Sequence, residues 1–506
     1  MLAKFTPQAL AHLAYALASA EHASDVLARV ASASLASMAA FDAEPLSSLA
    51  WALVTGAGAG ENASLFEAMA NRASALDFET FRTAELVGLV WAFAQHRVQR
   101  EQLLDKVARH WLAHGFAMFT PQQLSVACWS FAALGLGSRH TALFKKMSMA
   151  CVKGDFAGFA PRDVALVVWA FASCDLQQER FLYERASAHC LRLGLDAFGA
   201  HELVVLATGF AELGVAMDAP FFAHVFDACA RRGAGAFTPK ELATLAWAVA
   251  ASRVPHVGLV EHIGARFAST SLVALDAAAL SDAAWGLAAA STGASPAVAG
   301  ALAAIVCECQ RRGWAALSAR DTVTVLWSLA CAQQLCAPYA LDALNRFEAV
   351  SAASALEAPH DAMSAQMVAE VLAQWRADMG ADMHAPPLLR CIDADHWVRP
   401  HPTTPSPSAL AVLAAAEAHA RSLGCACRRD VASADGVVAA DVHVTTPLGV
   451  AFILDVVGSR KLACGTAAFR RRLLERAAPV REVDEKTWPA DAGRQRAAVA
   501  ELVGLA

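Results

Sequence analysis

The sequence predicts a mainly α-helical protein in which about nine two-helix repeats of about 39 residues stack as an α-solenoid, followed by a small α/β module. A Phe-Thr-Pro motif that begins at Phe5 returns at Phe119 and at Phe237. An aromatic residue follows most such anchors by ten positions, and the pattern changes near the C-terminus. We expect a helical-repeat solenoid at 1–350, a helical cap and proline-rich linker at 351–408, and a separate domain at 409–506.

The composition excludes several classes of protein. Apolar residues make up 57% of the chain and charged residues 17%, which excludes a mostly disordered chain. The longest charge-free stretches, 110–138 and 283–307, are each broken by Pro, Gly, Ser or Thr, so we expect no transmembrane helix and no membrane partner. The formal charge of −6 excludes a globally basic nucleic-acid binder, but it does not exclude a local basic face.

The 13 cysteines are scattered and odd in number, which is typical of a protein in a reducing compartment. The only tight pairs are Cys307 with Cys309 and Cys425 with Cys427. Neither pair has a second pair at zinc-ligand spacing, so we expect no metal and no cofactor.

Each repeat begins like a helical hairpin. The nine anchors are 36 to 42 residues apart. They are Phe5, Phe41, Phe81, Phe119, Phe159, Phe198, Phe237, Leu275 and Leu317. Where Thr-Pro follows the anchor, it supplies an N-cap and a proline at the first helical position. We expect a first helix of about 13 residues and a less regular second helix, for example at 101–114 and 220–232.

A column of tryptophans occupies the tenth position after the anchor. Seven of the twelve tryptophans stand there, and the next residue is always Ala, Ser or Gly. A large ring beside a tiny residue predicts close packing between neighbouring helices. Because apolar residues flank the rings, we expect a buried packing ladder, with base stacking on the rings as the alternative.

The residues that vary between repeats are the candidates for recognition. Positions 3, 7 and 14 after the anchor share one ridge of the first helix, and their side chains change from repeat to repeat. A constant scaffold with a variable ridge is what a protein that reads one base per repeat needs, although an ordinary solvated face is the simpler interpretation. The candidate RNA-binding residues on this ridge are Gln8, His12, Gln122, Arg162, His201, Lys240, Thr244, Arg320 and Thr324.

The last hundred or so residues predict a small α/β module. We expect a helix at 409–423, strands at 437–444 and 450–457, a basic helix around 469–476, a third strand at 480–483 and a closing helix at 494–502. No strand pattern is visible before residue 430. Arg470, Arg471 and Arg472 of the basic helix are candidates for phosphate contacts, a solvated helix face being equally consistent with the pattern.

The C-terminal module resembles a RAP domain. The matching residues are 440–442 on one strand, 452–458 on the next, the basic helix at 469–475 and Trp488. The repeats resemble the octotricopeptide-type repeats, and the related repeats of FAST-kinase-like proteins, that precede RAP domains. The resemblance implies an organellar protein that binds single-stranded mRNA or rRNA. It also implies a role in RNA processing or stability, translation or ribosome assembly, with an organellar ribosome or ribonucleoprotein as a further partner.

RAP domains are similar in fold to restriction-endonuclease-like nucleases. In this sequence Asp441 and Asp455 stand where such a nuclease would hold a divalent metal. A nuclease would also carry a lysine two residues after the second acid, and this chain has Val457 there. We therefore expect a degenerate site with no catalytic residues, in a protein that is not an enzyme.

Three functions remain open at this stage. The first is a sequence-reading RNA-binding protein, the second a protein-binding or ribosomal scaffold, and the third a metal-dependent RNA endonuclease. Residues 1–350 hold 25 Lys and Arg against 29 Asp and Glu, so the array is not basic in bulk and the scaffold function remains a candidate.

The family resemblance implies a mitochondrial location, with the chloroplast as the alternative. Residues 1–4 directly precede the first repeat and leave no room for a transit peptide, so we expect a truncated or late start.

Overall fold

The chain consists of two compact units, residues 1–228 and 229–506, seen here in a computed structural model. The structure describes residues 2–20, 24–56, 63–174, 176, 179–212, 219–291, 295–335, 367, 370–371, 374, 407–429, 442–447, 450–457, 464–475, 478–484, 488–489 and 491–503. The predicted cap and linker at 351–408 lie almost wholly outside these residues, and the domain division at 350 and 408 stays a prediction. None of the described helices is long and apolar enough to cross a membrane.

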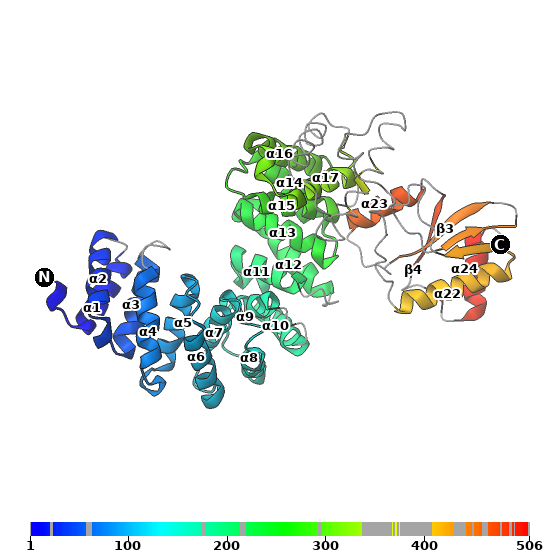
Figure 1. Cartoon of the computed structure of the whole chain (residues 1–506). Helices are drawn as coiled ribbons and strands as arrows, with labels where there is room; N and C mark the ends of the chain where they lie inside the picture. Colours follow the sequence, from blue (N-terminus) through cyan, green and yellow to red (C-terminus); the bar gives the residue numbers. More distant parts are fainter. Residues whose placement is uncertain are drawn as a thin grey trace. The chain divides into compact units, whose positions relative to one another are not determined.

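Unit 1 is a row of helical hairpins (Figure 1). The first helices are α1 (Pro7–Ser19), α3 (Ala43–Gly56), α5 (Thr83–Gln95), α7 (Pro121–Ala133), α9 (Pro161–Ser173) and α11 (Ala200–Glu212). The second helices are α2 (Ser24–Ala36), α4 (Ala63–Ala75), α6 (Glu101–His114), α8 (Thr141–Lys153), α10 (Arg180–Leu193) and α12 (Ala219–Arg232), the last of which crosses the unit boundary. Within the unit each first helix packs on the next first helix, and α2, α4, α6, α8 and α10 pack in the same order.

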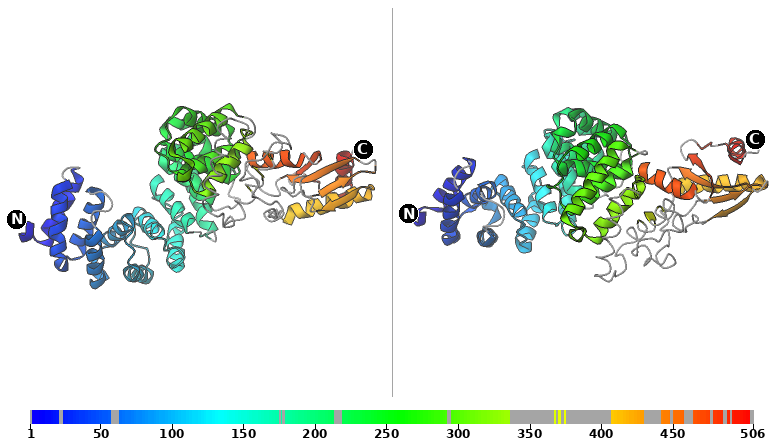
Figure 2. Two further views of the ribbon diagram at one scale, coloured as in Figure 1. Left: turned by 45° about the horizontal axis from the view of Figure 1, so that its top comes forward. Right: turned by 90° about the horizontal axis from the view of Figure 1, so that it is seen from above.

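Unit 2 continues the pattern and then changes to α/β structure (Figures 1 and 2). Its first helices are α13 (Pro239–Ser252), α15 (Ala277–Ala290) and α17 (Ala319–Cys331), and its second helices are α14 (Val257–Ser269) and α16 (Pro296–Arg312). The module consists of α22 (Pro407–Ser422), β1 (Ala426–Arg429), β2 (Val442–Thr445), β3 (Ala451–Val457), α23 (Cys464–Glu475), β4 (Val480–Asp484) and α24 (Ala492–Val503). The predicted fold class, a mainly helical repeat protein with a small C-terminal sheet, is confirmed.

The first helices begin where the sequence predicts, and for the expected reason. In α7 the Thr120 hydroxyl accepts a hydrogen bond from the Gln123 N–H at 3.2 Å, and the Gln123 side chain accepts one from the Thr120 N–H at 3.1 Å. Glu241 does the same for Thr238 at the start of α13. Among the described residues, a 3₁₀ turn directly precedes the anchor in six repeats, as at η3 (Phe78–Thr80) before Phe81. The sequence did not predict these turns.

The tiny residue after the aromatic position is where neighbouring first helices approach each other. A Cβ added to Gly286 of α15 would lie 2.4 Å from the carbonyl carbon of Ala246 and 2.5 Å from the nitrogen of Trp247, both in α13. In unit 1, a Cβ on Gly209 of α11 would lie 2.9 Å from Cγ1 of Val168 in α9. The predicted close packing is confirmed, and at Gly286 it is a contact between two backbones.

Buried polar side chains fix neighbouring repeats in register. The Ser125 hydroxyl in α7 donates to the Asp163 carboxylate in α9 at 3.0 Å. The same bond joins Ser281 in α15 to Asp321 in α17 at 2.9 Å. Asp163 also accepts from the Ala160 N–H at 3.1 Å, so one carboxylate caps its own helix and holds the preceding one.

The C-terminal module is a four-stranded sheet in the order β1-β2-β3-β4. The first two pairings are antiparallel, and β3 pairs with β4 in parallel after the crossover through α23. Helices α22 and α24 pack on each other, and their apolar residues form one core with β2, β3 and β4. The expectation of no strand before residue 430 is wrong, because β1 covers 426–429. Its exposed Arg428 and Arg429 hide the alternation that a half-buried strand normally shows.

Replacing Gly286 with Ala is expected to lower the free energy of unfolding by about 1–3 kcal/mol, because the added methyl group must push α13 and α15 apart. Thermal or urea unfolding of the purified protein measures this effect. The control is Gly88→Ala, also inside a first helix, where the added Cβ meets only the Ser47 hydroxyl at 3.4 Å. That variant should be neutral or more stable by up to about 1 kcal/mol. Equal unfolding midpoints for Gly286→Ala and the wild type would refute the backbone contact.

Candidate nucleic-acid interface

The first helices of each unit present an exposed row of side chains. Positions 3, 7, 10 and 14 after the anchor are three or four residues apart, so they lie in one row along the helix. Position 3 is mainly exposed, whereas positions 7 and 10 are mainly half-buried. All nine predicted contact residues of the repeats lie in this row: Gln8 and His12 in α1, Gln122 in α7, Arg162 in α9, His201 in α11, Lys240 and Thr244 in α13, and Arg320 and Thr324 in α17.

The aromatic column lies in the same row, so the prediction of a buried ladder is wrong for most of it. Six of the seven tryptophans are half-buried, and Tyr15, the first ring, is 50% exposed. Two pairs of neighbouring rings contact each other. The ring centroids of Tyr15 and Trp51 are 4.7 Å apart and those of Trp129 and Trp169 are 6.2 Å apart. The signal was present in the sequence, because position 10 lies seven residues, or two helical turns, after position 3.

The last ring of the column is buried, as predicted. Trp327 in α17 is only 2% exposed. Its indole N–H donates to the Glu370 carboxylate at 2.6 Å, and its ring centroid lies 6.1 Å from that of Phe469 in α23. In unit 2 the accessible part of the column is therefore formed by Trp247 and Trp285.

At the start of the row the polar side chains are bonded to each other. The Gln8 amide donates to the Glu44 carboxylate at 2.5 Å and lies 3.1 Å from Nε2 of His12. His12 Nε2 is also 3.8 Å from Glu44. A ligand here would exchange one set of hydrogen bonds for another, and Glu44 would repel a phosphate. This end of unit 1 is therefore suited to base edges rather than to the RNA backbone.

The cations of the row are Arg162, Lys240 and Arg320, and all three are exposed. In the part of the chain that the structure describes, the side chains of Arg162 and Lys240 make no hydrogen bond and no ion pair. Thr244 and Thr324 donate their hydroxyls to the backbone carbonyls of Lys240 and Arg320, at 3.0 and 2.9 Å. Arg162 and Lys240 are therefore available to a phosphate, and the two threonines can offer only their acceptor lone pairs.

Some cations in and just before the second helix α8 have structural partners instead. Arg139 forms ion pairs with Glu101 at 2.5 Å and with Asp105 at 2.7 Å, both in the preceding hairpin. The Lys146 ammonium donates to the carbonyl of Leu112 at 2.9 Å. Such contacts hold one hairpin to the next, so Arg139 and Lys146 are less available to a ligand than Arg162 and Lys240.

Comparison with known families agrees with this description. Residues 3–291, more than half of the chain, match the family described as RNA-editing substrate-binding complex 6 protein, RESC6. The chain belongs to the RESC6 family. It is thus a helical-repeat protein of an RNA-binding family, and the matched residues include the first helices from α1 to α15. A search of curated proteins found no match.

The basic helix α23 of the C-terminal module lies outside the residues that match the RESC6 family. Its arginines are less available to a phosphate than the sequence predicted. Arg471 is exposed, but it donates to Glu475 at 2.7 Å and to Glu482 at 3.0 Å, and these carboxylates raise its pKa. Arg470 is half-buried, and the side chain of Arg472 lies outside the described residues. A phosphate at Arg471 would compete with two carboxylates of the protein itself.

The predicted nuclease-like acids are only partly described. Asp441 lies outside the described residues. The backbone of Asp455 is in β3, in register with Glu482 of the parallel strand β4, while its side chain and that of Val457 are outside the described set. The absence of a catalytic site therefore stays a prediction.

Replacing Trp129 with Leu is expected to weaken RNA binding by about 1–3 kcal/mol, because leucine fills similar space but offers no π face to a base. The unfolding midpoint should change little, since the ring is half-buried. Fluorescence anisotropy with a labelled single-stranded RNA measures the affinity, and thermal unfolding measures the stability.

The control for this prediction is Trp111→Leu in α6. Trp111 is 3% exposed, and its ring centroid lies 5.6 Å from those of Phe119 and Phe131. This variant should lose about 1–3 kcal/mol of stability while its folded form keeps its RNA affinity. If Trp129→Leu lost stability but bound RNA normally, the column would be a packing feature alone.

Proposed function

We propose that the chain is an RNA-binding subunit of an RNA-editing complex, and that it holds single-stranded substrate RNA along the exposed row of its first helices. The observation that carries this proposal is the half-exposed aromatic column, which runs beside polar side chains that differ in each repeat. Membership of the RESC6 family, whose description names an RNA-editing substrate-binding complex, supports the same role.

In this proposal aromatic stacking supplies affinity and the variable positions supply selectivity. Rings such as Trp91 and Trp129 can stack on any base, because every base has a π face. Side chains such as Gln122 and His201, both exposed at position 3, can hydrogen-bond to base edges. The row has few cations, so the salt dependence of binding should be shallow for an RNA-binding protein.

The finer parts of the proposal rest on the resemblance of the sequence to organellar proteins. We propose that the repeats are of the octotricopeptide type, that the C-terminal module is a RAP domain, and that the protein acts in mitochondria, with chloroplasts as the alternative. The mixed sheet with its helices is consistent with such a module. The outcomes of RNA binding that remain to be distinguished are RNA editing, RNA processing or stability, translation and ribosome assembly.

We also propose that the chain binds RNA without cutting it. Val457 replaces the lysine that a nuclease of this kind would use, and an aliphatic side chain neither donates nor accepts a proton. Burial raises the pKa of Cys190, Cys229 and Cys309 to about 12, so these thiols are protonated and unsuited to nucleophilic catalysis at neutral pH.

A second candidate function is protein binding through the second helices. Met149 in α8 is 71% exposed, and Phe181 and Leu191 in α10 are 54% and 45% exposed. Large apolar side chains at this exposure are suited to a protein partner. This function is compatible with RNA binding on the first helices, because a subunit of a complex must contact both.

The experiment that tests the proposed function compares two pairs of charge removals. Arg162→Ala with Lys240→Ala should weaken binding to all single-stranded RNA sequences about equally. It should also reduce the slope of log affinity against log salt by up to about 1.4, at about 0.7 for each phosphate contact. Lys145→Ala with Lys153→Ala removes the same charge from exposed positions of α8 and should leave the slope unchanged. Equal effects of the two pairs would place the RNA elsewhere.

Cleavage is tested separately. Purified protein is incubated with labelled single-stranded RNA and Mg²⁺ or Mn²⁺, and the RNA should remain intact. Cleavage that disappears in Asp455→Ala would establish the nuclease function and contradict the proposal.

A further inference from the structure

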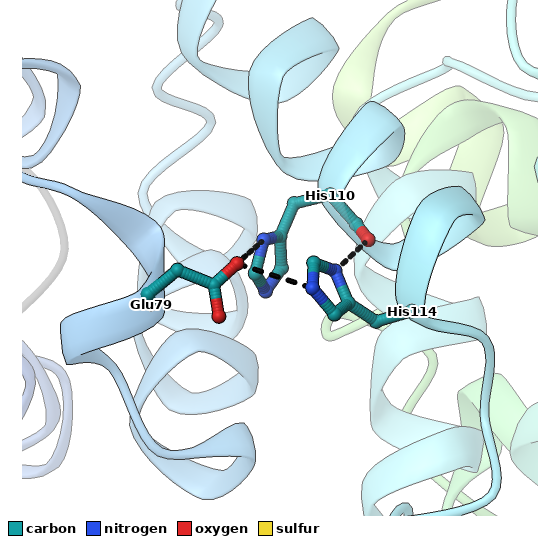
Figure 3. A group of neighbouring side chains, drawn as sticks. All are labelled: Glu79, His110 and His114. Atoms are coloured by element: carbon teal, nitrogen blue, oxygen red, sulfur yellow. Dashed lines mark hydrogen bonds and ion pairs between the residues drawn. The ribbon is translucent and has the colours of Figure 1, made fainter.

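A second group of chemically competent side chains lies away from the exposed row. Glu79 belongs to the 3₁₀ turn η3, and His110 and His114 lie one helical turn apart at the end of α6 (Figure 3). Glu79 Oε1 is 3.7 Å from Nδ1 of His110 and 3.1 Å from Nε2 of His114. The two imidazole centroids are 4.3 Å apart. Both rings therefore direct a nitrogen toward the same carboxylate oxygen.

The hydrogen bond of Nδ1 of His114 determines that Nε2 carries the lone pair of the neutral ring. Nδ1 of His114 lies 2.9 Å from the carbonyl oxygen of His110. A carbonyl only accepts, so Nδ1 carries the proton, and in the neutral ring Nε2 is a bare lone pair. That lone pair faces a carboxylate oxygen at 3.1 Å. Two acceptors at this distance repel each other unless a cation lies between them or the ring is protonated.

His110 is the more buried of the two histidines. Its side chain is 20% exposed and packs edge-on against Phe78 at 5.8 Å. Burial and then the neighbouring His114 lower the pKa of His110, and Lys106 adds to this effect, while Glu79 and Asp77 act in the opposite direction.

We propose that Glu79, His110 and His114 bind a divalent transition-metal ion of the zinc type, with a fourth position open to solvent. Their three ligand atoms all lie within 4.8 Å of one another. Zinc–nitrogen and zinc–oxygen bonds of about 2.0–2.2 Å place neighbouring ligands of a tetrahedral ion about 3.3 Å apart, close to the two distances to Glu79. The bond from His114 Nδ1 to a backbone carbonyl is the kind of contact that orients a metal-binding histidine.

The donor set and its exposure specify the ion further. Two imidazoles and one carboxylate suit Zn²⁺, Ni²⁺ or Cu²⁺ rather than Mg²⁺ or Ca²⁺, which prefer oxygen ligands alone. Glu79 and His114 are 63% and 54% exposed, so an ion can enter and keep a water ligand. Bound metal would join η3, just before the anchor Phe81, to the end of α6 in the repeat that follows. The prediction of no metal rested on cysteine spacing and took no account of two histidines four residues apart on one helix face.

Titration of the purified full-length chain with Zn²⁺ tests the proposal. Calorimetry should show one binding event that His114→Ala, His110→Ala and Glu79→Gln each weaken by roughly tenfold or more. Co²⁺ in place of Zn²⁺ should produce visible absorption bands that the same variants lose. Zn²⁺ should also raise the unfolding temperature of the wild type and not that of the variants, which separates lost binding from lost folding.

The matched control is His224→Ala. His224 is an exposed histidine of α12 whose Nδ1 also bonds to a carbonyl four residues earlier, that of Pro220 at 2.6 Å, and it lies outside the three-residue cluster. Its loss should leave the binding event intact. The proposal is overturned if His114→Ala binds Zn²⁺ as the wild type does, or if His224→Ala weakens binding equally. Zinc held only by exposed thiols such as Cys307 would give the first of these outcomes.

Discussion

The close approach of neighbouring first helices is the constraint on which the rest of the array depends. At Gly286 of α15 there is no room for a Cβ against the backbone of α13, and Gly209 of α11 meets α9 in a similar way. Small residues at this position bring helix axes near the lower end of the usual range of about 8–10 Å. Where two first helices approach in this way, the side chain just before the tiny residue lies at the edge of the contact.

That spacing explains why the tryptophans contact one another yet remain accessible. A ring at the edge of a close helix pair packs partly on its neighbour, as Trp129 does on Trp169, and leaves part of its surface to solvent. The variable side chains of position 3 lie two turns earlier on the same face. On the other side of the hairpins, contacts such as the ion pair of Arg139, in the turn before α8, with Asp105 in α6 help to hold neighbouring repeats together. The row that we propose to bind RNA therefore lies on the first helices, away from these contacts.

Much of the fold is readable from the sequence because its signals are local. Thr120 and Pro121 mark the start of α7, and the small residues predict the close contacts. The exposure of the tryptophans was misjudged, because apolar flanking residues say nothing about which side of the helix a ring occupies. Strand β1 was missed because Arg428 and Arg429 break the alternation. The cluster of Glu79 with His110 and His114 brings together a turn and a helix end that are about 30 residues apart in the sequence. Helical periodicity shows which residues share a face of one helix, so it does not predict this contact.

Photo-crosslinking tests the central claim, that RNA lies on the first helices, most directly. Single-stranded RNA with 4-thiouridine would be crosslinked to the full-length protein, and the modified peptides identified by mass spectrometry. The account predicts crosslinks in peptides that contain Trp91, Trp129 and Trp169, or the exposed side chains beside them. Crosslinks confined to the second helices, for example around Met149 and Phe181, or to the C-terminal module would contradict it.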